Sequence, residues 1–383
     1  MGLMRFMLAL AVASGHASGF FGTYIYPKVP GSHAVQIFYM ISGFLIALIL
    51  SGKYADTPQG NWIFYSNRAV KIYVPYLAIL AVTTLVWLVA YAVSRNAGPL
   101  GVFIKDGSTM SLGAWVFAIV TNLFLLGMEW GSMLIDRGGE LLFSPYAIEQ
   151  PPNAIQFTII IPAWTLSLEL AFYLIAPFVL RRHVLLIAAI ALASYTFRFQ
   201  AYAHGYRSIA LEYRFFPFEL SLFLYGALSY RLYAFLKERD MFKPRLSLAM
   251  TAACALTAIS LPKYLSQHQH QMYALVGLLL PALFDFSTRH RWDRWLGDLS
   301  YPLYLVHWPV CAVGLAFLDG SSTGPSSMNT VYAYLAVCVS ILLSMAINHF
   351  LVYPVDKWRQ RRAREAGAAA AEPRGRRESG VAA

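Results

Sequence analysis

The sequence predicts an all-α protein that crosses a membrane many times. Three observations indicate this class: 58% of the 383 residues are hydrophobic, only 13% are charged, and many apolar runs reach 17 residues or more. About 20 apolar residues in helical form cross the hydrocarbon core of a bilayer. Because every backbone polar group in that core must be paired within the chain, such runs are expected to be helices. We therefore expect a polytopic helical integral membrane protein.

About ten transmembrane helices are expected from eleven apolar segments. The basic loops place both termini on the same side, which requires an even number of crossings. The segment at 112–128 is short and precedes a long polar stretch, so we expect it to be re-entrant or half-inserted. The eleven segments are 5–22, 35–51, 72–92, 112–128, 158–180, 184–198, 214–235, 247–262, 271–288, 298–318 and 330–353.

The net charge of +11 arises from 30 Lys and Arg against 19 Asp and Glu. The basic residues gather in short loops and in the C-terminal stretch, which is the pattern of cytoplasmic loops and not of a nucleic-acid site. We expect a membrane domain over residues 1–359, a disordered basic tail over 360–383, and both termini in the cytoplasm. The three cysteines lie in apolar segments without metal-ligand spacing, which predicts packing roles and no metal site.

Two residues of the first segment require a chemical explanation. Arg5 precedes an apolar run, and His16 interrupts that run eleven residues later. Eleven helical residues rise about 16 Å and return to within roughly 20° of the starting direction. If Arg5 lies at the inner headgroups, His16 therefore lies near the middle of the bilayer on the same stripe. Such a histidine is either bonded across helices for packing or part of a functional site.

The second and third segments add small and basic residues. Ser42 and Gly43 lie where helices can pack closely. Arg68 and Lys71 are three residues apart, so they share one helix face at the cytoplasmic lip of the third segment. These cations either anchor the helix at the membrane surface or, together with Arg5, bind a phosphorylated ligand.

Polar side chains also interrupt two later segments. Glu169 lies about ten residues into an apolar run, where an unpaired carboxylate costs several kcal/mol unless it is protonated. Trp164 lies nearer the outer interface, where aromatic residues are common. Ser300, Tyr304 and His307 follow i, i+4, i+7 spacing on another apolar helix. This polar stripe indicates a lined cavity, although His307 by itself fits packing equally well.

These motifs together resemble the membrane acyltransferase-3 family. Arg5 and His16 match its Arg-x10-His first helix, and "IFYMISGFLI" resembles its FF-x-I-S-G-F-L helix. Arg68 with Lys71 resembles its basic third-helix start, "WTLSLELAFYLIAP" its W-S-L-x-x-E-x-x-F-Y-x-x-x-P element, and "LGDLSYPLYLVHWPV" its S-Y-x-x-Y-L-x-H-x-P helix. The matches occur in family order over nearly the whole chain.

Four sites depart from the family pattern, one of them Leu170-Ala171, which replaces the common polar pair after the glutamate. Lys71 stands where the family usually has arginine, which weakens a bidentate contact with phosphate. Thr165 replaces the usual serine. Tyr353-Pro354 stands where the family often has Glu-Pro, so no function is carried over to that helix.

The resemblance implies an O-acyltransferase of the bacterial inner membrane. Its donor would be cytoplasmic acyl-CoA, usually acetyl-CoA, used as a substrate and not as a permanently bound cofactor. Its acceptor would be a hydroxyl of a cell-surface polysaccharide, a lipooligosaccharide or a similar glycan. The oligomeric state does not follow from the sequence.

We assign roles by combining the resemblance with the residue chemistry. His16 is expected to act as general base or to accept the acyl group itself. Glu169 is expected to orient His16 or to bind the acceptor. The cations Arg5, Arg68 and Lys71 are expected to bind the phosphates of the donor. The residues expected to bind the acceptor are Trp164, Ser300, Tyr304 and His307.

Two other functions remain compatible with polar residues in membrane helices. A glycan or lipid transporter would line a translocation path with them, although the internal repeats typical of transporters are not evident. A non-catalytic scaffold for envelope assembly would tolerate replacement of Arg5 or His16.

Overall fold

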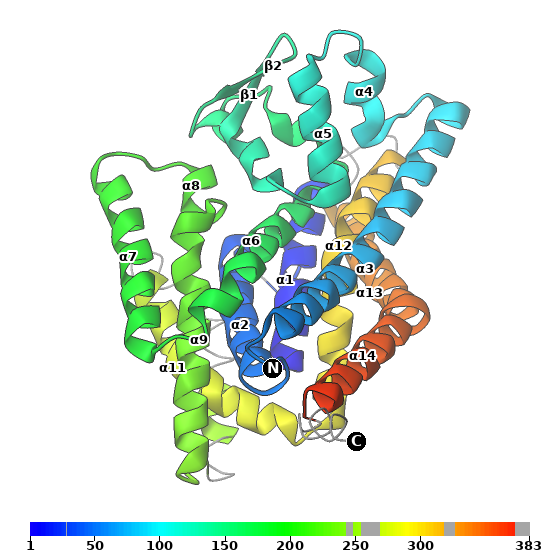
Figure 1. Ribbon diagram of the computed structural model, residues 1–383. Helices are drawn as coiled ribbons and strands as arrows, with labels where there is room; N and C mark the ends of the chain where they lie inside the picture. The colour runs from blue at the N-terminus through cyan, green and yellow to red at the C-terminus, as the bar shows by residue number, and fades with distance from the viewer. Residues whose placement is uncertain (28, 243–247, 254–268, 318–325, 372–383) are drawn as a thin grey trace, which may run out of the picture.

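The computed structural model describes residues 1–383 except 28, 243–247, 254–268, 318–325 and 372–383. Long helices form a bundle, and a group of short elements covers one end of it (Figure 1). We call the end at which α1 begins the α1 end, and the opposite end, which carries β1 and β2, the hairpin end. The long helices are α1 (Gly2–Phe20), α2 (Gly31–Gly52), α3 (Pro58–Ser94), α6 (Trp164–Val179), α7 (Val184–Ala203), α9 (Phe216–Glu238), α11 (Gln269–Thr288), α12 (Arg291–Phe317), α13 (Ser326–Ile347) and α14 (Tyr353–Ala371).

The lengths of these helices confirm a polytopic membrane protein. Among the described residues, 8 helices are long and apolar enough to cross a bilayer. The helix α9 has 23 residues and packs between α2 and α7, although it carries charges along its length. Most of the predicted segment 247–262 lies outside the described residues. The total of about ten crossings therefore remains a prediction.

The hairpin end is built from short elements. The helix α5 (Leu112–Phe124) has 13 residues and is about 20 Å long, which is too short to cross the bilayer. This length is consistent with the prediction that segment 112–128 does not span. One face of α5 exposes Leu112, Val116 and Ile119, which fits partial insertion into the membrane. The other short elements are η1 (Gly98–Leu100), α4 (Gly101–Lys105), η2 (Met128–Met133), β1 (Leu134–Arg137), β2 (Glu140–Phe143), η3 (Ala147–Glu149), η4 (Ala154–Phe157), η5 (Ile161–Ala163) and α8 (Ile209–Tyr213). The strands β1 and β2 pair antiparallel, with Leu134 opposite Phe143.

The helix α1 packs lengthwise against α12 and begins on a side chain of that helix. The carboxylate of Asp293 accepts hydrogen bonds from the backbone N–H of Gly2 at 2.7 Å and of Leu3 at 2.9 Å. A carboxylate at a helix N-terminus satisfies free N–H groups and interacts favourably with the helix dipole. Gly2 permits this approach, because a Cβ atom there would lie 1.6 Å from the backbone oxygen of Asp293. These contacts fix the height of α1 relative to α12.

The helices α2 and α9 approach each other through a pair of glycines. A Cβ atom on Gly43 would lie 1.8 Å from the carbonyl oxygen of Phe223, and one on Gly226 would lie 1.8 Å from that of Met40. Small residues at such crossings let membrane helices pack backbone against backbone. The predicted packing role of the Ser42-Gly43 pair is therefore confirmed for Gly43.

A buried polar network ties α2, α7, α9 and α11 together. Arg198 of α7 forms an ion pair with Glu219 of α9, and both side chains are almost fully buried. Gln36 donates from Nε2 to Glu219 Oε1 at 3.1 Å and accepts a hydrogen bond from Tyr273. Buried charges are tolerated when they are paired and hydrogen-bonded in this way. This network lies behind α2, on the side away from the cavity described below.

The C-terminal helix α14 follows a π-helical turn, η7 (Asn348–Val352), that ends α13. It extends to Ala371 and so enters the stretch that we expected to be an unstructured tail. Residues 372–383 lie outside the described part. The predicted domain boundary at residue 359 therefore remains a prediction.

Candidate active site

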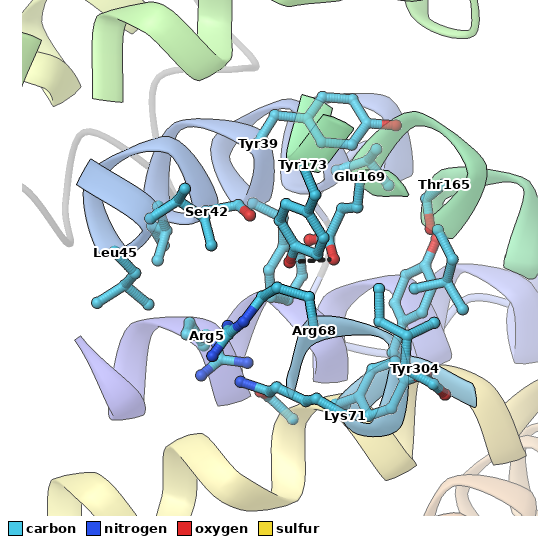
Figure 2. Close-up of a pocket in the computed structure, with 18 of the residues that line it drawn as sticks. Arg5, Tyr39, Ser42, Leu45, Arg68, Lys71, Thr165, Glu169, Tyr173 and Tyr304 are labelled. Carbon is cyan, nitrogen blue, oxygen red and sulfur yellow. Dashed lines mark hydrogen bonds between the residues drawn. The ribbon is translucent and has the colours of Figure 1, made fainter. Parts of the chain in front are cut away.

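A cavity of about 240 Å³ lies among α1, α2, α3, α6 and α12 (Figure 2). Its wall is apolar along α2 and polar on the facing helices. Six of the nine residues predicted to form the site line it, although they come from four helices that are distant in sequence. These six are Arg5, Arg68, Lys71, Glu169, Ser300 and Tyr304.

Three cations gather on one side of the cavity. Arg5, Arg68 and Lys71 point toward one another from α1 and α3 (Figure 2). None of the three forms an ion pair within 4.0 Å with a carboxylate of the described residues. Arg68 Nε is buried and has no hydrogen-bond partner among the described residues. Uncompensated charge at membrane depth is costly. The arrangement therefore fits an anionic ligand, and guanidinium groups are well suited to phosphate.

Further basic side chains surround this cationic side. Arg359 of α14 is almost fully buried and forms an ion pair with Asp356 on its own helix. Its charge acts on Lys71 of the cavity wall. Lys53, just beyond α2, lies in the same field: partial burial lowers its pKa, as do the nearby cations Arg68 and Arg359, while Tyr54 acts in the opposite direction. A positive potential of this kind concentrates anions at the α1 end of the cavity.

Glu169 lies on the cavity wall beside a tyrosine. The hydroxyl of Tyr173 donates to Glu169 Oε2 at 3.0 Å, and both residues come from α6 (Figure 2). We expected that Glu169 orients His16 or binds the acceptor. The structure shows a hydrogen bond from His16 to His307 and none between Glu169 and His16. The orienting role is therefore not supported, and acceptor binding remains a prediction.

His16 has a different partner, namely His307 of α12. His16 Nδ1 lies 2.8 Å from His307 Nε2, and the ring planes are parallel within 3°. The other nitrogen of His307 lies 3.1 Å from the carbonyl oxygen of Leu303. The indole of Trp308 meets the His16 ring edge-on at a centroid distance of 5.0 Å. His16 is thus held by a fixed set of neighbours on α12.

These contacts determine the tautomers of two neutral imidazoles. A carbonyl oxygen only accepts, so His307 Nδ1 must donate its proton to Leu303. His307 Nε2 then carries a lone pair and must accept from His16 Nδ1. His16 Nε2 is left unprotonated with its lone pair available. An imidazole oriented in this way is a general base or a nucleophile.

The ring of Tyr304 separates the cavity from the histidine pair. Tyr304 lines the cavity, and its ring packs edge-to-face against His307 at 5.9 Å between centroids. Its hydroxyl donates to the carbonyl oxygen of Pro162 at 3.2 Å. His16 and His307 are not part of the wall of this cavity. His307 is fully buried, with both ring nitrogens engaged, whereas His16 is partly exposed. His307 thus holds His16, and the expectation that it also binds the acceptor stays a prediction.

Trp164 also lies off the cavity wall. Its ring stacks under the guanidinium of Arg214, 4.6 Å from the ring centroid, and Tyr213 lies beside both. Arg214 is 9% exposed, and its Nε has no partner among the described residues. The charge of Arg214 acts on His16. Trp164 thus positions a cation near His16, a role that the sequence did not suggest.

Three residues of the site were missed at the level of sequence. Tyr39 and Tyr173 line the cavity, and Arg214 lies beside Trp164. Each one follows or interrupts a run of aromatic and apolar residues, so it has the appearance of a packing or interfacial residue. Glu169 and Tyr173 are four residues apart and so share one helix face, and this spacing was the one signal that could have found Tyr173.

The fold and the site define a polytopic helical membrane protein with an interior cavity that combines cations with a nearby pair of imidazoles. The acyltransferase domain family Acyl_transf_3 matches residues 1–349. The chain therefore belongs to this family and is an enzyme that transfers acyl groups. Comparison with curated proteins and with solved structures gives no significant match.

Proposed function

We propose that the protein is an O-acyltransferase that moves an acyl group, typically acetyl, from cytoplasmic acyl-CoA to a hydroxyl of a cell-surface glycan. The observation that carries this proposal is the group of uncompensated cations, Arg5, Arg68 and Lys71, on the wall of a cavity inside the membrane bundle. Coenzyme A is a donor with several phosphate groups at one end and the thioester at the other. The cavity has cations on one side and an apolar wall along α2, which matches the charged and uncharged ends of this donor.

In this proposal the donor enters at the α1 end, which faces the cytoplasm. The phosphates bind at Arg5, Arg68 and Lys71, with Lys53 and Arg359 adding to the attraction. The pantetheine arm follows the apolar wall of α2, formed by Leu45, Ile46 and their neighbours. The thioester then reaches the far end of the cavity, at Thr165 and Tyr304.

The histidine pair supplies the base in this mechanism. The acceptor oxygen attacks the thioester carbonyl carbon while its proton passes to His16 Nε2, the nitrogen left free by His307. The C–S bond then breaks, the ester forms, and coenzyme A leaves as a thiolate that takes the proton from His16. In the alternative route the same nitrogen accepts the acyl group first and passes it to the acceptor. In both routes the ring of Tyr304 turns aside so that the thioester and His16 meet.

The acceptor approaches from the hairpin end in this proposal. Two features support this direction: His16 is partly exposed, and Arg214 with Trp164 lies on that side of the bundle. Aromatic faces and a guanidinium are suitable for a sugar ring with polar substituents. A polysaccharide or lipooligosaccharide of the envelope is therefore the acceptor class that we propose, with the inner membrane as the location.

The proposal is tested by replacing the two histidines separately. Release of thiol from acetyl-CoA by purified protein and acetylation of surface polysaccharide, read by mass spectrometry, are the measurements. His16→Ala should lose about 10²- to 10⁴-fold in turnover, the usual contribution of a general base. His307→Gln keeps a side-chain oxygen that accepts from His16 and should retain more activity than His307→Phe.

His204→Ala serves as the control, because His204 lies on an exposed loop and bonds only to its own helix, at Gln200. It should leave turnover unchanged. Full activity of a correctly folded His16→Ala protein would exclude the proposed mechanism. Absence of any acetyl-CoA-dependent labelling in the wild-type protein would exclude the proposed donor.

A further inference from the structure

The hydroxyl of Tyr39 is an unusual group on the cavity wall. Tyr39 is 1% exposed, and its ring stacks on Phe223 at a centroid distance of 4.6 Å. Its hydroxyl has no hydrogen-bond partner among the described residues. A buried donor without a partner costs about 1–3 kcal/mol, and such groups are rare in folded proteins. A phenylalanine would pack against Phe223 equally well without this cost.

The other tyrosine hydroxyls of the cavity wall, and that of Thr165, already have acceptors. Tyr304 and Thr165 donate to the carbonyl oxygen of Pro162 at 3.2 and 3.1 Å, and Tyr173 donates to Glu169. Tyr301 donates to the carbonyl oxygen of Ile72 at 2.8 Å. Tyr39 is therefore the tyrosine of this wall whose donor remains free for a ligand.

Tyr39 and the cations lie on different parts of the cavity wall. It lies across the cavity from Arg5 and Lys71 (Figure 2). Along α2 it is ten residues, or about 15 Å, from Ile49, which lines the cavity toward the α1 end. A donor whose phosphates bind at the cations therefore extends its opposite end toward Tyr39.

We propose that Tyr39 donates a hydrogen bond from its hydroxyl to the carbonyl oxygen of the donor's thioester. This inference rests on the proposed function, and it assigns Tyr39 as a catalytic residue of that reaction. When the acceptor oxygen attacks the carbonyl carbon, the electron pair of the C=O double bond moves onto the carbonyl oxygen. The hydrogen bond from Tyr39 stabilises this oxyanion, and it remains in place when the pair returns and the C–S bond breaks. Tyr39 keeps its proton throughout.

The variant Tyr39→Phe tests this assignment because it removes only the hydroxyl. Turnover with acetyl-CoA should fall about 10²-fold, the usual effect of losing one oxyanion donor. The melting temperature of the ligand-free protein should be unchanged or higher, because an unsatisfied buried donor has been removed. The carbonyl stretch of bound acetyl-CoA labelled with ¹³C at C1 should lie at lower frequency in the wild-type protein than in the variant, as measured by difference infrared spectroscopy.

Tyr76→Phe is the matched control. Tyr76 is also fully buried, but its hydroxyl donates to the carbonyl oxygen of Asn122 at 2.7 Å, and it does not line the cavity. This variant should melt at a lower temperature and keep wild-type turnover.

The outcomes separate the two proposals. Wild-type turnover in Tyr39→Phe, or an unchanged carbonyl frequency, overturns the role of Tyr39 and leaves the proposed function intact. If the wild-type protein releases no thiol from acetyl-CoA, the proposed function and the role of Tyr39 are both overturned.

Discussion

Buried polar residues in this protein fall into two groups. Arg198 and Glu219 pair with each other and hold α7 and α9 together, although Arg198 Nε and Glu219 Oε2 have no hydrogen-bond partner among the described residues. Arg68 Nε and the Tyr39 hydroxyl are buried without partners among the described residues, and both line the cavity. Buried polar groups are normally hydrogen-bonded, so each unpaired one calls for an explanation. For the two groups on the cavity wall, we propose that a bound substrate supplies the missing partner.

Glu129 is an unsatisfied group at the hairpin end, and it predicts a dependence of stability on pH. It is 7% exposed, and Oε2 has no partner among the described residues. Burial raises the pKa of Glu129 above its usual value of 4.5, although a hydrogen bond with Ser167 acts in the opposite direction. The protonated form thus favours the folded state. Its contribution is complete below pH 4.5 and is lost as the pH rises through the raised pKa.

The variant Glu129→Gln should therefore melt at a higher temperature than the wild-type protein at neutral pH and at a similar temperature at pH 4. Thermal unfolding in detergent between pH 4 and pH 8 provides the measurement. Glu140→Gln, at an exposed position of β2, should reproduce the wild-type curve. If the melting temperatures of Glu129→Gln and wild type change with pH in parallel, ionisation of the Glu129 carboxyl does not destabilise the fold, which would contradict this prediction.

The sequence indicates many site residues but few of their partners. Periodicity identifies the helix face on which a residue lies, and six predicted residues do line one cavity. Periodicity does not identify which helix lies opposite. His16 and His307 are 291 residues apart, and their pairing depends on the height at which Asp293 holds α1 against α12. Tyr39 was missed because a tyrosine in an apolar run looks like a packing residue.

At the scale of elements, α2 has two different faces. Tyr39, Ser42 and Leu45 line the cavity, whereas Gly43 packs against the backbone of α9. A close backbone contact leaves little freedom for α2 to shift. The cavity wall is therefore rigid on this side, which is what a site with fixed geometry requires.

Gly43→Ala should destabilise the protein because its methyl group would lie within 1.8 Å of the Phe223 carbonyl oxygen. Overpacking of this kind costs about 1–3 kcal/mol and forces the helices apart. The free energy of unfolding, measured by denaturant titration in detergent, should fall by at least that amount, and turnover should fall with it.

Gly52→Ala on the same helix is the control. A Cβ atom there meets nothing within 4 Å, so alanine should be neutral or stabilise the helix by about 0.5–1 kcal/mol. Equal stability of the Gly43→Ala and Gly52→Ala proteins would contradict the close approach of α2 and α9.

At the scale of the whole molecule, the polar elements are distributed unequally between the two ends. The hairpin end carries the small sheet and the short helices, and the α1 end carries the basic residues near α14 (Figure 1). From the positive-inside rule we expect the α1 end to face the cytoplasm. The helical class follows from composition, but the hairpin did not, because its strands of 4 residues are too short to leave a periodic signal.

This orientation is tested with single cysteines in a chain whose Cys254, Cys311 and Cys338 have been replaced by serine. Arg137→Cys, exposed at the hairpin, should react with a membrane-impermeant maleimide in intact cells. Glu238→Cys, exposed at the far end of α9, should react only after permeabilisation. The reverse pattern would show that the α1 end faces outward, and acyl-CoA could not then reach the cations from the cytoplasm.

The position of Tyr304 has a consequence for the ion gradients across the membrane. Its ring stands between the cavity and the partly exposed imidazole of His16, with 5.9 Å between the ring centroids of Tyr304 and His307. An open channel through this point would let protons and small ions flow down their gradients whenever the enzyme is without substrates. With the ring of Tyr304 in this position, we expect the resting enzyme to remain in the bilayer without dissipating the ion gradients.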